Sequence, residues 1–480
     1  MISHSKHKFA KYFLPDQKKA KRRSFKKAEI IKSIFKLTPQ LKKLGENKLA
    51  YIKTYGCQAN IRDSETIIGI LKQCSYDLTN DQTKADLIIL NTCAIRENAE
   101  QKVFGELGHL KHAKKKKDVL IGVCGCMVQQ PHVAKQLRSQ TKHVDFVFGT
   151  HNIHMLPEIL LSLEHNKRNF CVFSEEGKIY EDLPVTHTST VKAFVNITYG
   201  CDKFCSYCVV PMVRGSLRSR KKEDIIAEVK QLMANGYKEV TLIGQNVNSY
   251  GIDLYKDYFF VDLLIDVAKT KIPRLRFTTC NPWNFDEKII VAMVKYKNIM
   301  PAIHLPIQSG DEKILKAMNR TMDINKYYEI IDQLRKKLPS VSISTDLIVG
   351  FPNETDEQFA KTIEMYERIK FDNAYTFIYS PRKDTPAAKI DDKICLATKQ
   401  KRLAQLNELV RKYAKWNCDR YIGKTVKVLV EGASKKNKNV LTGYSPEWKV
   451  VNFNGTAKIG DIVEVKVLTS SRFSLNGIQI

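Results

Sequence analysis

The 480-residue sequence predicts an α/β protein with three folded parts: an N-terminal parallel α/β domain, a central partial TIM-type (β/α)6 barrel and a small C-terminal OB-like β-barrel. Three observations lead to this fold class. Strand-like and helix-like patterns alternate over residues 49–165, alternate again from residue 191, and give way to five short strand-like runs after residue 419. Alternation is typical of parallel sheets, whereas consecutive short strands are typical of antiparallel barrels.

A basic segment, residues 1–48, precedes the first domain. It has 15 Lys and Arg residues against 3 Asp and Glu residues, so it contributes +12 to the chain's net charge of +28. We expect a flexible tail. Because the segment lacks the apolar core and cleavage site of a secretory signal, we do not expect the protein to be secreted. The longest apolar runs have about half the length of a membrane span, so we expect no membrane segment. The charge favours a polyanion partner such as RNA, although a lysine-rich genome would also produce it.

The N-terminal domain, residues 49–165, has four near-continuous apolar runs, which predict buried strands of a parallel sheet. These strands are expected at Leu49–Thr54, Ala85–Asn91, Val119–Cys124 and Val144–Phe148. Helices are expected at Ser64–Gln73, Asn98–Lys114, Gln130–Ser139 and Ile153–Leu163. A polar linker, residues 166–190, is expected to follow.

Three cysteines, Cys57, Cys93 and Cys126, lie close to the ends of the first three strands. Ligand sites of open α/β sheets lie beyond the carboxyl ends of the strands, so we expect these auxiliary cysteines to converge. We interpret them as ligands of an iron–sulfur cluster with one iron left free. The alternative is three ordinary buried cysteines. Cys124 competes with Cys126 for the third position.

A second group of cysteines, Cys201, Cys205 and Cys208, has the spacing CxxxCxxC, with Tyr207 before the last one. Three thiolates hold a [4Fe–4S] cluster by three of its four irons, and the fourth iron is then open to a small molecule. Since electron-transfer clusters usually have all four irons capped, the pattern indicates chemistry. A structural zinc site is the alternative, but zinc requires four ligands and no second cysteine pair lies nearby.

The barrel region, residues 191–418, has six predicted strands that alternate with helices. The strands are expected at Phe194–Thr198, Glu239–Ile243, Arg274–Thr278, Ala302–Leu305, Val341–Val349 and Ala374–Tyr379. The helices are expected at residues 222–235, 260–270, 286–297, 325–337 and 355–369. Six repeats make three-quarters of a TIM-type barrel, whose active site lies at the strand carboxyl ends. The CxxxCxxC loop follows the first strand, as this geometry requires.

A basic amphipathic helix at Leu396–Trp416 is expected to lead out of the barrel into residues 419–480. Five short strands are expected there, at Thr425–Glu431, Asn439–Thr442, Lys449–Phe453, Ile462–Val467 and Ser474–Ile478. A small barrel of this kind is a common nucleic-acid-binding shape, and we favour RNA binding over a cap that only adds stability.

Residues 49–480 resemble the methylthiotransferases of the radical S-adenosylmethionine (SAM) superfamily. The resemblance is carried by Thr54–Gln58, Asn91–Glu100, Gly125–Met127, Tyr199–Cys201, Gly244–Gly251, His304–Gly310, Asp346–Pro352 and Tyr379–Arg382, together with the CxxxCxxC cysteines. The second and fifth of these segments are similar to the branch of the family that modifies tRNA. The last 62 residues are similar to a TRAM domain.

The resemblance implies a transferase that adds a methylthio group to C2 of a dimethylallyl-modified adenosine next to the tRNA anticodon. It implies two [4Fe–4S] clusters, with one SAM molecule supplying the methyl group at the auxiliary cysteines and another supplying the 5′-deoxyadenosyl radical at the CxxxCxxC cysteines. The implied partners are the tRNA anticodon arm, a reductant such as flavodoxin or ferredoxin, and the iron–sulfur assembly machinery. We expect a cytoplasmic monomer.

Two other functions stay open at this point. One is a methylthiotransferase for threonylcarbamoyl adenosine in tRNA or for a ribosomal-protein aspartate, and Asn246 and the segment Arg96–Glu100 argue against it. The other is a non-catalytic metal-containing RNA-binding protein, which would not cleave SAM.

The resemblance also implies roles for individual residues, and it assigns no catalytic residue beyond the clusters. The Gly-Cys-Met pattern favours Cys126 over Cys124 as a ligand. Tyr207 is expected to stack on the SAM adenine. Residues at strand ends are expected to contact SAM, unless they only form tight turns: Gly244, Gln245, Gln308, Ser309, Gly310 and Asp346.

Five further residues have open interpretations. We expect His304 to be a hydrogen-bonded barrel histidine and not a catalyst. Cys280 lies near the predicted barrel mouth and is considered as an additional ligand. Arg214, Arg218 and Arg220 either hold tRNA phosphate or lie on a solvated face.

Overall fold

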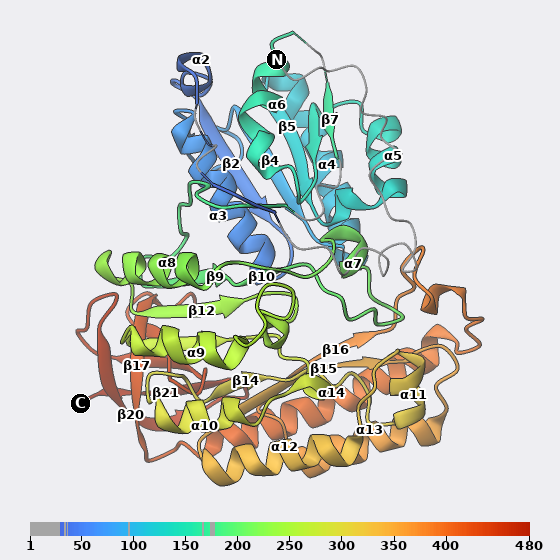
Figure 1. Cartoon of the computed structure of the whole chain (residues 1–480), viewed down its shortest axis with the longest axis vertical. Helices are drawn as coiled ribbons and strands as arrows, with labels where there is room; N and C mark the ends of the chain where they lie inside the picture. The colour runs from blue at the N-terminus through green and yellow to red at the C-terminus, as the bar shows by residue number, and fades with distance from the viewer. Residues whose placement is uncertain (1–28, 33–34, 36, 95–96, 166–167, 173–177) are drawn as a thin grey trace. The chain divides into compact units, whose positions relative to one another are not determined.

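The computed structural model describes residues 29–32, 35, 37–94, 97–165, 168–172 and 178–480 (Figure 1). The chain divides into two compact units. The first is Met1–Thr188 with Thr198–Phe204 and Cys208–Arg220, and the second is Ser189–Ile197, Cys205–Tyr207 and Lys221–Ile480. Most of the predicted tail, and Arg96 of the discriminating segment, lie outside the described residues.

The first unit contains a parallel sheet, as its apolar runs predict, but the sheet has six strands where four were expected (Figure 1). In sheet order the strands are β3 (Asp77–Leu78), β2 (Leu49–Thr54), β4 (Leu87–Thr92), β5 (Leu120–Gly125), β6 (Phe146–Phe148) and β7 (Asn169–Cys171). The helices are α3 (Gln58–Gln73), α4 (Glu97–Lys116), α5 (Pro131–Gln140) and α6 (Leu156–Ser162).

Two apolar layers hold helices on both faces of this sheet. One layer joins α3 and α6 to strand residues such as Leu87 and Ile89. The other joins α4 and α5 to the alternate residues Ile88 and Leu90. Because successive strand side chains point to opposite faces, a continuously apolar strand supplies both layers.

Two expectations for this unit are wrong. Residues 29–48, which we expected to belong to a flexible tail, include a paired strand in their described part, because β1 (Glu29–Ile31) pairs in parallel with β8 (Lys178–Tyr180). The short helix α2 (Pro39–Lys42) follows, and Leu41 lies in the core. The polar linker likewise supplies the strands β7 and β8. Strand pairing of such short segments depends on neighbours that composition does not reveal.

The second unit contains the predicted partial barrel. Parallel strands form two three-stranded sheets, β13-β12-β9 and β14-β15-β16, and an isolated parallel bridge joins Leu275 to Ile299, three residues before β14. The strands are β9 (Lys192–Asn196), β12 (Glu239–Ile243), β13 (Arg274–Phe277), β14 (Ala302–His304), β15 (Ser342–Val349) and β16 (Asn373–Ile378). The helices are α8 (Lys222–Ala234), α9 (Phe260–Lys269), α10 (Lys288–Lys295), α11 (Glu312–Ala317), α12 (Ile324–Lys337) and α13 (Asp356–Ile369).

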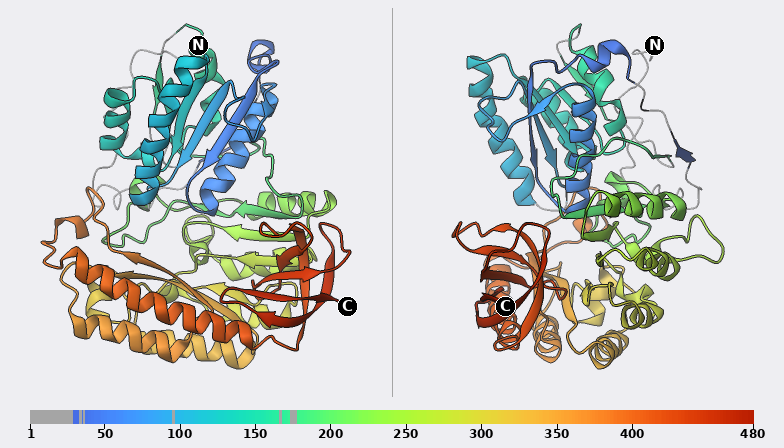
Figure 2. Two further views of the ribbon diagram at one scale, coloured as in Figure 1. Left: turned by 180° about the vertical axis from the view of Figure 1, so that it is seen from behind. Right: turned by 90° about the vertical axis from the view of Figure 1, so that its left-hand side faces the viewer.

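The long helix α14 (Leu396–Asp419) leads from the partial barrel to a closed five-stranded barrel, which Figure 2 shows in red. Its strands are β17 (Thr425–Ala433), β18 (Leu441–Tyr444), β19 (Val450–Asn454), β20 (Ile462–Ser470) and β21 (Ser474–Gln479). All three predicted parts of the fold class are therefore confirmed. None of the helices in the described segments is long and apolar enough to cross a membrane.

Candidate active site

The auxiliary cysteines lie at the topological switch point of the first sheet. The chain runs from β2 outward to β3 and then returns to the other side of β2 as β4. Ligands of open α/β sheets bind at the carboxyl ends of the strands where this reversal occurs. Cys57 follows β2 as the N-cap of α3, Cys93 directly follows β4, and Cys126 directly follows β5.

Buried amides tie the three loops together. The Asn60 side-chain NH2 donates to the Thr92 carbonyl at 2.9 Å, and the Asn91 side-chain NH2 donates to the Asn60 carbonyl at 2.8 Å. The Cys126 backbone N–H also donates to the Thr92 carbonyl, at 2.9 Å. The Cys57 thiol donates to Asn60 Oδ1 at 3.4 Å. These bonds fix the spacing of the loops that carry the auxiliary cysteines.

The first loop approaches the second cysteine so closely that only glycine fits at Gly56. Its φ is +138°, and a Cβ placed there would lie 2.9 Å from Cys93 Cβ. Cys93 and Cys126 are buried and Cys57 is half-buried. Cys124, in contrast, belongs to the core layer under α3 and α6, and burial raises the pKa of its thiol. Cys124 therefore packs in the core, whereas Cys126 interacts electrostatically with Cys57 and Cys93.

A buried arginine lies against this group. Arg214 Nε donates to Cys126 Sγ at 3.1 Å, and its Nη2 donates to Asp63 Oδ2 at 2.6 Å. Burial raises the pKa of the Cys126 thiol to about 12, while the guanidinium opposes this rise by favouring the thiolate. Arg214 is thus neither free to hold tRNA phosphate nor on a solvated face, so both predicted roles are wrong.

An apolar cover joins the two predicted cluster segments within the first unit. It consists of Ala94, Cys126, Val209 and Val213, with Met212 packed against them. Val209 immediately follows Cys208, and Val213 belongs to the short helix α7 (Val210–Val213). The chain that leaves the CxxxCxxC loop therefore packs directly on the third auxiliary cysteine.

The auxiliary cysteines are compatible with an iron–sulfur cluster. Within the segments that the structure describes, no three His, Cys, Asp or Glu side chains are close enough together to hold one ion. A [4Fe–4S] cluster differs because each thiolate binds a separate iron. Two buried thiols and one half-buried thiol on three loops, with the Arg214 guanidinium beside Cys126, fit that chemistry.

The CxxxCxxC cysteines are positioned by backbone bonds in the first unit and by an arginine in the second. The Cys201 N–H donates to the Gly215 carbonyl at 3.1 Å, next to the antiparallel pair β10 (Thr198–Tyr199) and β11 (Arg218–Ser219). The Lys203 N–H donates to Cys201 Sγ at 3.4 Å, and the Val210 N–H donates to Cys208 Sγ at 3.5 Å. Such bonds to sulfur favour the thiolate that iron requires.

In the second unit Arg320 donates hydrogen bonds to both Cys205 and Tyr207. Its Nη1 donates to Cys205 Sγ at 3.6 Å and to the Tyr207 hydroxyl at 3.4 Å, while Nη2 donates to the Pro306 carbonyl at 2.6 Å. Burial opposes the charge, but Tyr207 and Cys205 raise the pKa of Arg320, so the guanidinium is charged. The sequence contains no local signal for this residue, because it lies 115 positions after Cys205.

The predicted SAM-contacting residues lie within or shortly after the barrel strands β12, β14 and β15. Gln308 is buried with φ +82°, a conformation that costs a non-glycine residue about 1–3 kcal/mol and is concentrated at functional sites. Its N–H donates to the Asp346 carbonyl at 2.9 Å. The Asp346 carboxylate lies 3.4 Å from His304 Nε2, and His304 Nδ1 lies 3.0 Å from the Ser344 hydroxyl. His304 is thus the hydrogen-bonded barrel histidine that we expected, and Gly244 and Gln245 follow β12.

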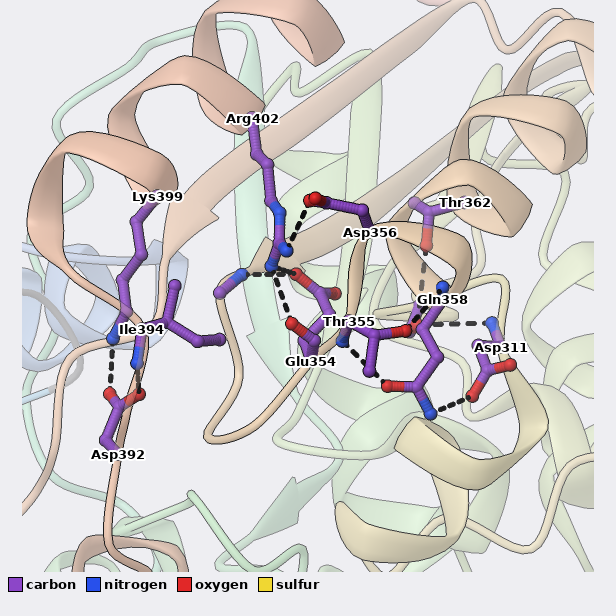
Figure 3. Close-up of polar contacts among 12 residues, drawn as sticks. Asp311, Glu354, Thr355, Asp356, Gln358, Thr362, Asp392, Ile394, Lys399 and Arg402 are labelled. Atoms are coloured by element: carbon purple, nitrogen blue, oxygen red, sulfur yellow. Dashed lines mark hydrogen bonds and ion pairs between the residues drawn. The ribbon is translucent and has the colours of Figure 1, made fainter.

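A polar network beneath these loops holds them in place (Figure 3). The Gly310 N–H donates to Thr362 Oγ1 at 3.0 Å, and the Ser309 hydroxyl lies 3.4 Å from the same atom. The Gly350 N–H donates to Glu354 Oε2 at 2.7 Å, and Arg402 Nη1 donates to the same carboxylate oxygen at 3.0 Å. Helices α13 and α14 therefore support the two loops that follow β14 and β15.

The remaining candidate residues have structural roles. Arg220 pairs with Glu181 through two bonds of 2.7 Å, and Arg218 donates to the Lys178 carbonyl at 2.7 Å, so neither lies on a solvated face. Cys280 belongs to the apolar core of the partial barrel, and burial raises the pKa of its thiol. We therefore drop Cys280 as an additional ligand.

Comparisons with known proteins agree with this arrangement. Residues 49–149 match the uncharacterized protein family UPF0004, residues 195–366 match the radical SAM superfamily, and residues 419–479 match the TRAM domain. Among solved structures, a radical SAM methyltransferase, TsrM from Kitasatospora setae, is similar with a TM-score of 0.52 at 12% identity. It covers 71% of this chain and 74% of its own, a likeness in fold alone. Fold and motifs thus define a radical SAM protein, a family that implies SAM and a [4Fe–4S] cluster as cofactors.

Curated relatives define the family more closely. This chain is 54% identical to the tRNA-2-methylthio-N(6)-dimethylallyladenosine synthase of Malacoplasma penetrans, over 99% of this chain and 97% of that protein. Proteins of the same name from Bacillus subtilis and Staphylococcus epidermidis are 48% identical, over 98–99% of this chain and 93–94% of theirs. The chain therefore belongs to the tRNA methylthiotransferases of the radical SAM superfamily.

Proposed function

We propose that this protein adds a methylthio group to C2 of a dimethylallyl-modified adenosine next to the tRNA anticodon. The observation that carries the proposal is the identity of 48–54% along almost the whole chain to relatives named for this reaction. The C2–H bond of adenine is not acidic and offers no polar group for general acid–base attack. Radical chemistry suits that carbon.

The six cysteines at the two loop systems are assigned as cluster ligands in this proposal. The CxxxCxxC cysteines would hold the cluster that binds SAM, and the auxiliary cysteines would hold a second [4Fe–4S] cluster. When bound, these groups supply the electron that cleaves SAM and the sulfur that is transferred. Three cysteines in each set leave one iron of each cluster free of protein ligands.

The protein's own side chains would bind and orient the reactants. Tyr207, whose hydroxyl accepts from Arg320, offers its ring to the SAM adenine. At the barrel mouth, the left-handed backbone of Gln308 and the carboxylate of Asp346 are candidates for the ribose and methionine parts of SAM. The apolar residues that pack around Cys126, Ala94, Val209 and Val213, would exclude water from the transferred sulfur.

We also propose partners for substrate binding, electron supply and cluster loading. The TRAM domain and the chain's net charge of +28 favour binding of the tRNA anticodon arm, and this substrate puts the activity in the cytoplasm. A one-electron reductant such as flavodoxin or ferredoxin would supply the electron. The iron–sulfur assembly machinery would load the clusters, and we propose that the protein acts as a monomer.

Mass spectrometry of tRNA nucleosides from cells that lack this gene tests the proposal. We expect the methylthio nucleoside to disappear and its dimethylallyl precursor to accumulate. Re-expression of the intact chain should restore the nucleoside, whereas a chain with the CxxxCxxC cysteines changed to alanine should not. An unaltered methylthio-dimethylallyl nucleoside would contradict the proposal and direct attention to threonylcarbamoyl adenosine or a ribosomal-protein aspartate.

A further inference from the structure

Two buried hydrogen bonds in the first unit connect a carboxylate, a guanidinium and a cysteine sulfur. Asp63 on α3 accepts from Arg214 Nη2 at 2.6 Å, and Arg214 Nε donates to Cys126 Sγ at 3.1 Å. The Arg214 and Asp63 side chains are only 8% and 10% exposed. A cation enclosed to this degree cannot reach an RNA phosphate, so it acts on the groups that it touches.

Arginine suits this position because its planar guanidinium donates from two nitrogens at once. One nitrogen is held by Asp63 and another is directed at the sulfur. The backbone at Arg214 is fixed as well, since its N–H donates to the Val210 carbonyl and its carbonyl accepts from Arg218, both at 2.8 Å. The guanidinium therefore has a defined position next to Cys126.

The position matters for an iron–sulfur cluster on the auxiliary cysteines. Reduction adds one electron, and hence one negative charge, to the cluster. The reduction potential of such clusters depends on net charge and on hydrogen bonds to the sulfurs. A guanidinium that donates to a ligand sulfur stabilises the reduced state and raises the potential. The Asp63 carboxylate is negatively charged and therefore has the opposite effect on the potential.

We propose that Arg214 is a positioning residue that raises the reduction potential of the auxiliary cluster, and that Asp63 limits the size of this effect. The inference rests on the proposed function, because it takes the auxiliary cysteines as cluster ligands. The pair would decide which oxidation state of that cluster predominates at a given strength of reductant.

The test measures the midpoint potential of the auxiliary cluster alone. The parent protein is the full chain with the CxxxCxxC cysteines changed to alanine, reconstituted anaerobically with iron and sulfide and titrated with dithionite under EPR detection. Arg214→Gln, Arg214→Lys and Asp63→Asn are compared in this background. Arg220→Gln is the matched control, because Arg220 and Glu181 form an equally buried pair in the same unit, with side chains 7% and 6% exposed.

We expect Arg214→Gln to make reduction of the cluster about tenfold less favourable. For one electron this corresponds to a midpoint potential about 59 mV lower. Arg214→Lys should recover most of this shift because it keeps the charge. Asp63→Asn should move the potential upward, and Arg220→Gln should leave it unchanged. Loosened packing would not shift the midpoint potential in opposite directions in the Arg214 and Asp63 variants.

An unchanged potential in an iron-loaded Arg214→Gln variant would overturn the inference. So would an equal shift in Arg220→Gln, since the effect would then be unspecific. If Arg214→Gln binds no iron, Asp63→Asn decides: a higher potential supports the inference, and an unchanged potential or loss of iron overturns it. A parent protein without iron would refute the second cluster itself, and the inference with it, whereas an iron-loaded parent with no response to Arg214 refutes only the inference.

Discussion

Replacement of Arg402 by methionine tests the support beneath the barrel-mouth loops (Figure 3). The Arg402 side chain is 7% exposed and its partner Glu354 is 1% exposed, with 3.0 Å between Nη1 and Oε2. Glu354 in turn accepts from the Gly350 N–H at 2.7 Å. Removing one partner of a buried ion pair leaves an uncompensated charge and costs about 3–5 kcal/mol of unfolding free energy.

Thermal unfolding measures this loss. At about 2–4 °C per kcal/mol, Arg402→Met should lower the Tm by at least roughly 6 °C. The matched control is Arg368→Met, because Arg368 and Asp332 are 4.0 Å apart and 58% and 70% exposed, and such surface pairs contribute about 0–1 kcal/mol. The double variant Glu354→Gln with Arg402→Met should recover part of the loss, since glutamine keeps an acceptor for the Gly350 N–H without the buried charge.

The pH dependence gives an independent check of the same charge. Burial raises the pKa of Glu354 above its ordinary 4.5, and loss of Arg402 would raise it further. A carboxyl whose pKa is raised by folding contributes stability that is present below pH 4.5 and is lost as the pH rises through the folded-state pKa. The deficit of Arg402→Met should thus be smaller at pH 5 than at pH 8. A Tm close to that of Arg368→Met, or no recovery in the double variant, would refute this reasoning.

Three further predictions concern the clusters and the first unit. Alanine at any one of the CxxxCxxC cysteines should abolish 5′-deoxyadenosine formation and leave one cluster by iron analysis; persistence of 5′-deoxyadenosine would show that the assignment is wrong. Alanine at all three auxiliary cysteines should preserve SAM cleavage but eliminate the methylthio product, and unchanged iron content would exclude a second cluster. Burial lowers the pKa of His154, which stacks on Tyr180, to about 4, so stability should be lost as the pH falls below 6.5, by about 2 kcal/mol at pH 5. His154→Phe should remove this loss between pH 7 and pH 5 in thermal unfolding, and an unaltered pH profile would assign the effect to another group.

Much of the fold follows from apolar periodicity. The strand at Glu239–Ile243 has the predicted bounds, and β15 alternates between buried and half-buried residues along its length. Short strands such as β1 and β8 were missed because three residues carry too little pattern. Their pairing joins positions about 150 residues apart, from Glu29 to Lys178, which no local signal reveals.

The convergence of the auxiliary cysteines was predictable, because they follow three neighbouring strands, β2, β4 and β5, of one parallel sheet. A sheet of that kind presents the carboxyl ends of its strands along one edge. The residues that act on the cysteines were not predictable. Arg214 lies 88 positions from Cys126, and Arg320 lies 115 positions from Cys205, so each contact exists only in the folded chain. Gln308 was selected by resemblance, but its left-handed backbone has no glycine to indicate it.

The two arginine–sulfur contacts have one electrostatic origin. Three thiolates at a buried site oppose one another's ionisation, and burial adds to that cost, as the raised pKa of Cys126 illustrates. Lysine would be a poorer compensating cation in a closed site, because its ammonium is strongly hydrated and loses more on burial than a guanidinium does. Arginine also keeps its charge at any pH at which the protein is folded. A cysteine set on short loops therefore requires a cation from a distant part of the chain, and this chain supplies one arginine to Cys126 and another to Cys205.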